Sequence, residues 1–142
     1  SERLAALAES RRVLKTGGII AAAFLCRFAP LRFAAQRLPE WIVHNAERME
    51  RILTTGRDDQ PKTFTHAYLS RPEEVEPLMR SAGFEMCALI GCEGITAGHA
   101  EAVNRLTGSL WEQWVNLNYR MGRDPAMHGA SDHLLYIGRK TA

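Results

Sequence analysis

The sequence predicts a single-domain α/β protein in which helices pack on a layered sheet. Amphipathic segments with helical spacing alternate with short apolar segments along the chain, and this alternation is typical of α/β folds. The first apolar segment, residues 19–26, contains no polar residue, which predicts a strand covered on both faces, as in a parallel sheet. The length of 142 residues is sufficient for one domain with a substantial core.

The first half of the chain is predicted to be mainly helical on either side of this strand. Residues 3–14 carry an apolar stripe at helical spacing, and the two glycines that follow end this helix. Two prolines bracket a short helix at 31–38, and a longer helix is expected at 40–53. Residues 54–65 are polar, which predicts a long and mobile loop.

The second half continues the alternation of helix and strand. Ser70 and Glu73 have the spacing of a capping box, which predicts a helix that ends at Gly83 and is bent by Pro77. The remaining expected elements are a strand at 84–92, a short helix at 99–106, a helix from a second capping box at Ser109 and Glu112 to Gly122, and a final strand at 133–140. Three strands are therefore expected.

The composition excludes several classes of function. The net charge of +2, from 18 basic and 16 acidic residues, argues against a dedicated binder of nucleic acid or membrane surfaces. No apolar run approaches the ~18–20 residues of a membrane span, and the N-terminus does not resemble a signal peptide. Cys26, Cys87 and Cys92 lack regular spacing, which predicts reduced, buried thiols in a cytoplasmic protein, with no shared metal site.

Three segments carry a family resemblance. They are Arg-Val-Leu-Lys-Thr-Gly-Gly-Ile-Ile at 12–20, the helix and turn at 73–90 with Ser-Ala-Gly-Phe at 81–84, and His-Leu-Leu-Tyr-Ile-Gly-Arg-Lys at 133–140. In this order they resemble the C-terminal half of class I S-adenosylmethionine-dependent methyltransferases. Thr16 stands where the family usually has proline. The segments cover most of the chain outside two helical insertions, at 29–56 and 95–128.

The resemblance implies a partial Rossmann-like methyltransferase sheet that contains strands five, six and seven, with the seventh antiparallel and between the other two. The glycine loop after strand one and the acidic residue after strand two, which hold the cofactor in the family, have no counterpart. The intact protein is therefore expected to use S-adenosylmethionine to methylate a small-molecule acceptor. The 142 residues alone are expected to bind no cofactor or metal and to be inactive.

An acceptor pocket is expected where the parallel strands end, because ligands of open α/β sheets bind outside the carboxyl ends of the strands. The first strand ends at 26–28, the second at 92–94, and the final strand begins at the same rim, at 131–133. The two insertions leave from this rim and could act as a lid. The candidate substrate-binding residues are Arg27, Phe28, His66, Tyr68, Glu93, Trp111 and Tyr119.

Each candidate also has a purely structural interpretation. Arg27 could form a surface salt bridge rather than anchor an anionic acceptor. Glu93 could cap a helix rather than orient or deprotonate an acceptor, and His66 could be a hydrogen-bonded structural residue. Trp111 and Tyr119, eight positions apart, could be packing residues rather than an aromatic cage.

No catalytic triad is expected. Ser131, Asp132 and His133 superficially suggest a hydrolase, but adjacent strand positions point to opposite faces. Methyl transfer needs alignment of the acceptor and sometimes a base. The lack of an obvious catalytic constellation is therefore compatible with the resemblance.

A rival interpretation is a non-enzymatic α/β interaction module that assembles through its sheet edge. Without strands one to four, residues 19–25 would lie at an edge with unpaired backbone groups, next to an uncovered apolar sheet face. Both interpretations therefore predict a homo-oligomer joined through this strand or by exchanged helices. A lysine in place of Ala22 is expected to weaken the association of the subunits through this strand.

Overall fold

The computed structural model describes residues 2–59 and 66–142. The elements are α1 (Glu2–Val13), β1 (Ile19–Cys26), α2 (Ala29–Arg37), α3 (Trp41–Thr55), β2 (Arg57–Asp58), β3 (Ala67–Ser70), α4 (Pro72–Ser81), β4 (Phe84–Gly91), α5 (Ala100–Val103), α6 (Gly108–Gly122) and β5 (His133–Lys140), with two 3₁₀ turns, η1 (Gly94–Thr96) and η2 (Pro125–Ala130). Strands β1 and β5 have the predicted bounds, and the α/β class is confirmed.

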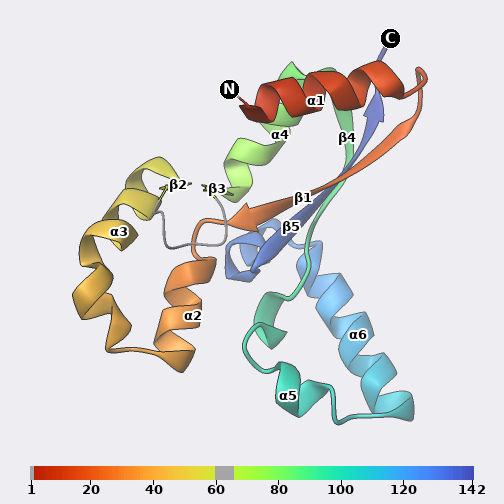
Figure 1. The fold of residues 1–142 in the computed structure, drawn as a ribbon. Helices are drawn as coiled ribbons and strands as arrows, with labels where there is room; N and C mark the ends of the chain where they lie inside the picture. Colours follow the sequence, from red (N-terminus) through yellow and green to blue (C-terminus); the bar gives the residue numbers. More distant parts are fainter. Residues whose placement is uncertain (1, 60–65) are drawn as a thin grey trace.

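The strands form one mixed sheet in the order β2-β3-β1-β5-β4 (Figure 1). Strand β5 lies between β1 and β4 and is antiparallel to both. This is the arrangement expected for strands five, seven and six of the methyltransferase sheet. The expectation of three strands was wrong, because β2 and β3 add a short antiparallel pair. Strand β3 is parallel to β1 through two residue pairs, Leu25 with Leu69 and Cys26 with Ser70.

The region predicted to be a polar loop, residues 54–65, is partly regular. Thr54 and Thr55 end α3, and Gly56 closes the helix with a positive φ of 74°. Arg57 and Asp58 then pair with β3. Residues 60–65 lie outside the described residues, so the predicted mobility of this part remains a prediction.

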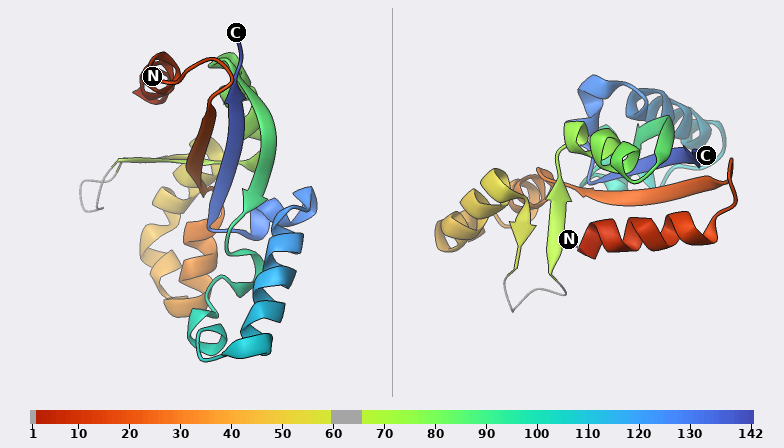
Figure 2. Two further views of the ribbon diagram at one scale, coloured as in Figure 1. Left: turned by 90° about the vertical axis from the view of Figure 1, so that its right-hand side faces the viewer. Right: turned by 90° about the horizontal axis from the view of Figure 1, so that it is seen from above.

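One face of the sheet carries the main core. Val75 and Met79 of α4 pack with Leu134 and Tyr136 of β5, and Leu7 of α1 reaches the same cluster. The Tyr136 hydroxyl donates to the Phe84 carbonyl at 3.2 Å, and burial raises the pKa of this phenol. Helix α4 lies behind the strands, whereas α1 lies beside the free edge of β1 (Figure 2).

The opposite face of β1 is uncovered, so the prediction that both faces are buried was wrong. Ile20 points into the core, whereas Ile19, Ala21, Ala23 and Leu25 are exposed. Figure 2, left, looks onto this face. An uncovered apolar face is one of the consequences expected for the half-sheet.

Three other local predictions need correction. The first capping box is shifted by one residue, because the Glu74 carboxylate accepts the Arg71 backbone N–H at 3.1 Å and Arg71, not Ser70, is the N-cap. The second box is not formed, because α6 begins at Gly108 after an N-cap at Thr107. Of the thiols, Cys26 is buried, but Cys87 and Cys92 are exposed.

The segments predicted as insertions leave the sheet at one end. Helices α2 and α3 on one side, and α5 and α6 on the other, lie beyond the carboxyl end of β1 (Figure 1). Within the described part of the chain, no helix combines the length and apolar character needed to cross a membrane. Residues 2–59 and 66–142 also contain no cluster of three or more His, Cys, Asp or Glu residues suited to a metal ion.

Candidate functional site

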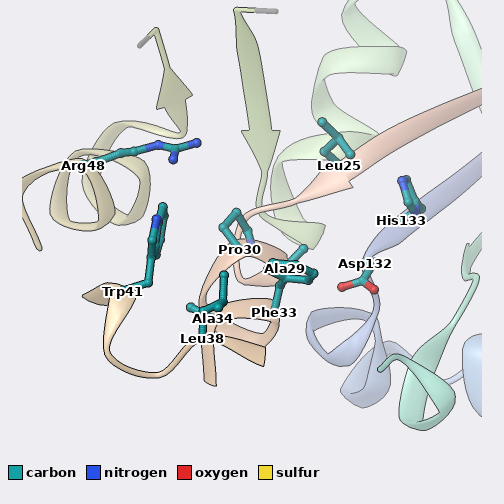
Figure 3. Close-up of a pocket in the computed structure, with 10 residues that line it drawn as sticks. All are labelled: Leu25, Ala29, Pro30, Phe33, Ala34, Leu38, Trp41, Arg48, Asp132 and His133. Carbon is teal, nitrogen blue, oxygen red and sulfur yellow. The ribbon is translucent and has the colours of Figure 1, made fainter. Parts of the chain in front are cut away.

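An apolar pocket of about 440 Å³ lies where β1 ends, between helices α2 and α3 and the start of β5. Its lining consists of Leu25, Ala29, Pro30, Phe33, Ala34, Leu38, Trp41, Arg48, Asp132 and His133. Trp41 and Arg48 lie on one side and Asp132 and His133 on the other, with the α2 side chains between them (Figure 3). The pocket therefore occupies the rim at which the sheet topology predicts a ligand site.

The apolar wall follows from how the chain turns after β1. Pro30 in the first turn of α2 favours an immediate helix start, and α2 then places Phe33 and Leu38 along the pocket. Helix α3 begins at Trp41, directly after the turn, so its indole closes the wall. Phe33 is 59% exposed and lines the pocket together with the exposed Leu25 and Leu38; a contiguous apolar patch of this kind is typical of a ligand groove or an interaction site.

The charged side chains Arg48 and Asp132 at the pocket each form an ion pair within the chain. Arg48 donates to Asp58, with 2.9 Å from Nε to Oδ1, and its guanidinium lies 5.2 Å from the Trp41 ring. Asp132 forms an ion pair with Arg32. These charges are balanced by partners within the chain, so the pocket favours a neutral, largely apolar ligand.

Glu93 holds His133 at the pocket rim. Its Oε1 lies 2.6 Å from His133 Nδ1, and its Oε2 accepts the His133 backbone N–H at 2.9 Å. A carboxylate at Nδ1 favours the tautomer that carries its proton there. In this neutral tautomer, Nε2 is a hydrogen-bond acceptor.

A second polar cluster joins the end of β1 to the start of α4. Arg27 is only 3% exposed. Its Nη2 donates to both Glu74 carboxylate oxygens, at 2.8 and 2.9 Å, and to the Tyr68 hydroxyl at 3.1 Å, while Nε donates to the Leu69 carbonyl. Tyr68 in turn donates to Glu74 at 3.1 Å. The guanidinium is therefore engaged in a buried network and is not directed at a ligand.

Gly56 permits this network. A Cβ at this position would lie 2.5 Å from Arg27 Nη2 and 2.7 Å from the Leu69 carbonyl oxygen. The residue also has a positive φ of 74°. Both constraints require glycine here.

The structure brings together some of the seven candidate residues and separates others. Arg27 and Tyr68 are in contact, whereas Glu93 lies at the other side of the rim, against His133. Phe28 precedes α2, and its ring lies 3.8 Å from the position that a Cβ of Gly129 would take.

The remaining candidates lie on the surface. The His66 side chain is 75% exposed and lies 3.8 Å from Asp59. Trp111 and Tyr119, on α6, are 40% and 52% exposed. Among the described residues, none of the seven candidates lines the apolar pocket, although Glu93 acts on it through His133.

Sequence reasoning identified the rim but missed the residues that line it. Phe33, Leu38 and Trp41 come from the predicted insertion at 29–56, and their apolar character was the available signal. The sequence places His133 at the rim, at the start of the final strand, but indicates no role for it in the site. Its pairing with Glu93 depends on the register of β4 and β5, which the sequence does not reveal.

Comparison with known proteins does not assign the pocket. No protein-family model matches the sequence, and no curated protein matches it. The interpretation of the site therefore rests on the chain's own residues.

Proposed function

We propose that this chain is the acceptor-binding half of a class I S-adenosylmethionine-dependent methyltransferase, and that its apolar pocket binds a small-molecule methyl acceptor. The observation that carries the proposal is the position of the pocket, at the carboxyl end of β1 and between the α2–α3 segment and the start of β5. The order β1-β5-β4 with an antiparallel β5 supports it as well, since the resemblance implies this arrangement. We place the protein in the cytoplasm in this proposal, because its cysteines are free.

The chain's own residues do not fit the cofactor. Such a site needs a glycine-rich turn whose backbone can approach a nucleotide at the start of a helix. At two glycines, Gly91 at the end of β4 and Gly98 further along the chain, the protein's own side chains occupy the space beside the backbone. A Cβ on Gly91 would lie 2.1 Å from Ser131 Oγ, and one on Gly98 would lie 1.8 Å from Gln36 Oε1. In the proposal, the methyl donor is therefore held by a part of a longer protein.

The test is methyl transfer by the natural full-length protein from tritium-labelled S-adenosylmethionine to a panel of small aromatic and aliphatic acceptors. Phe33→Ala is expected to raise KM for the acceptor several-fold while cofactor binding is unchanged. Leu110→Ala, which alters a similarly exposed side chain on α6, serves as the control. A full-length protein that does not bind S-adenosylmethionine by calorimetry would reject the proposal, and micromolar binding by residues 1–142 alone would reject the division into halves.

The uncovered face of β1 favours a second candidate, the non-enzymatic module that assembles with its own copies. Ile19 and Leu25 are 49% and 41% exposed, and the pairs formed by β3 involve only the end of β1. Ala22 is unsuitable as a probe because it packs against the core; Ala21 is exposed. Light scattering should show an oligomer that Ala21→Lys weakens and Ala35→Lys, on the exposed side of α2, does not. A monomeric native chain at high concentration would exclude this candidate.

A further inference from the structure

His133 is the polar side chain of the pocket with a ring nitrogen that remains available. Nδ1 is paired with Glu93 Oε1 at 2.6 Å. For Nε2, residues 2–59 and 66–142 supply no hydrogen-bond partner. The ring is about half exposed, at 46%, and lines the pocket. It can therefore accept a proton from a molecule that enters.

The charged residues that line the pocket with His133 each have a partner of opposite charge. From its own segment comes Asp132, which is paired with Arg32 of α2. From α3 comes Arg48, paired with Asp58. The turn after β4 supplies Glu93, whose two oxygens both contact His133. An imidazolium at this position would thus gain the Glu93 carboxylate as its partner.

Glu93 is also fixed in place. It accepts the backbone N–H of His133 with one oxygen and contacts the ring with the other. The strands set this geometry, since the Cys92 backbone N–H donates to the His133 carbonyl at 3.0 Å. Glu93 follows the last residue of β4 by two positions and precedes η1. The dyad is thus anchored where the β4–β5 pairing ends, as a positioned acid–base group requires.

The rest of the pocket suits a flat apolar ring. Seven of its ten lining residues are apolar, and two of them, Phe33 and Trp41, are aromatic. A volume of about 440 Å³ lies within the usual range of small-molecule sites. The combination of an aromatic wall and a single available nitrogen base matches an aromatic molecule that carries a hydroxyl group.

We propose that the pocket binds a phenol-type ligand and that His133 Nε2 accepts its hydroxyl proton. The O–H bond breaks, its electron pair stays on the phenolic oxygen, and the proton forms a bond with the Nε2 lone pair. Glu93 is a positioning residue that stabilises the resulting imidazolium through Nδ1. This inference deepens the proposed function by naming the acceptor class, and only the use of the phenolate in methyl transfer rests on that function.

The experiment uses 4-nitrophenol and the chain of 142 residues, because the phenolate of this probe absorbs visible light and the phenol does not. Titration at a mildly acidic, well-buffered pH follows ionisation by the phenolate band. Occupancy is followed by quenching of tryptophan fluorescence, to which Trp41 in the pocket contributes together with Trp111 and Trp114. Binding is expected to raise the phenolate fraction several-fold above that of the free probe. A probe that fails to bind, or that binds with the spectrum of the free phenol, overturns the proposal.

Four variants assign the effect to the site. His133→Gln is expected to retain binding of 4-nitrophenol but to lose the excess phenolate. Glu93→Gln is expected to reduce the excess phenolate. Phe33→Ala is expected to weaken both signals together, whereas His99→Gln, which alters an exposed histidine before α5, should change neither. Excess phenolate that survives His133→Gln, or binding that is insensitive to Phe33→Ala, would overturn the assignment.

These outcomes are separable from those of the proposed function. A full-length protein without methyltransferase activity leaves the phenolate signal and its dependence on His133 intact. Conversely, methyl transfer to thiols or amines alone, together with an absent phenolate signal, would retain the methyltransferase and reject the hydroxylated acceptor.

Discussion

The buried network of Arg27, Tyr68 and Glu74 allows a stability prediction to be worked out from the structure. Glu74→Gln removes the negative charge that receives both contacts from Arg27 Nη2, at 2.8 and 2.9 Å. Arg27, at 3% exposure, cannot recover its solvation. It keeps its bonds to the Leu69 carbonyl and the Tyr68 hydroxyl.

Glu74→Gln is expected to lower the free energy of unfolding by about 2 kcal/mol. Breaking a fully buried ion pair by removing one partner costs about 3–5 kcal/mol. The Glu74 side chain is 33% exposed, so water screens part of the interaction and lowers this figure. The glutamine oxygen can still accept the Arg71 backbone N–H, so the start of α4 should be retained.

Urea denaturation measures the effect through the midpoint at constant m-value. Glu73→Gln is the matched control, because Glu73 is 68% exposed and its nearest Arg71 nitrogen is 3.9 Å away; it should change stability by less than about 0.5 kcal/mol. The double variant Arg27→Met/Glu74→Gln should be more stable than Glu74→Gln, because no unpaired charge remains buried. Equal effects of the two glutamine variants, or a double variant no more stable than Glu74→Gln, would refute the reasoning.

Three further predictions follow from close packing and burial. Gly122→Ala should destabilise by about 1–3 kcal/mol, against the usual gain of alanine in helices, because the new Cβ would lie 2.2 Å from the Gly91 carbonyl oxygen; a urea midpoint that rises would contradict this. Cys87 should react promptly with a thiol reagent, and Cys92 more slowly, because burial and the Glu93 carboxylate raise its pKa. Cys26, which is buried and whose pKa is raised by burial, should react only on unfolding; three equally fast thiols in native protein would exclude the buried site. Burial raises the pKa of Tyr136, so its neutral form is favoured in the folded state. The contribution of the neutral Tyr136 phenol to the free energy of unfolding is present below the unfolded pKa of about 10 and is lost at higher pH. The unfolding free energy should therefore fall above about pH 10, and Tyr136→Phe should make the fall shallower.

The parts of the fold that were predictable have strong local signals. Residues 19–26 and 133–140 are apolar runs with clear boundaries, and both strands have the predicted bounds. Strand β3 has four residues, and two of them pair with β1; such a short segment carries no useful periodicity. Continuous apolarity also did not reveal which face of β1 is uncovered, because alanines suit either environment.

The site was predictable in location but not in composition. The rule for open sheets placed it at the rim from the order of the elements alone. The lining depends on the angle between α2 and α3 and on the pairing of Gly91 with Leu134. That pairing includes a register irregularity between Met86 and Ala88, and a one-residue shift changes which side chains face the rim.

The small second core has a consequence for how a molecule could reach the pocket. Met49 and Ile52 of α3 and Leu69 of β3 form a cluster of their own, and two parallel residue pairs connect this unit to β1. Units with few buried contacts open at a lower free energy than the whole domain. Because Trp41 and Arg48 belong to this unit, its opening removes one wall of the pocket. A ligand that contacts Trp41 should therefore disfavour this local opening, and it should slow amide exchange along α3 while leaving the β1–β5 ladder unchanged.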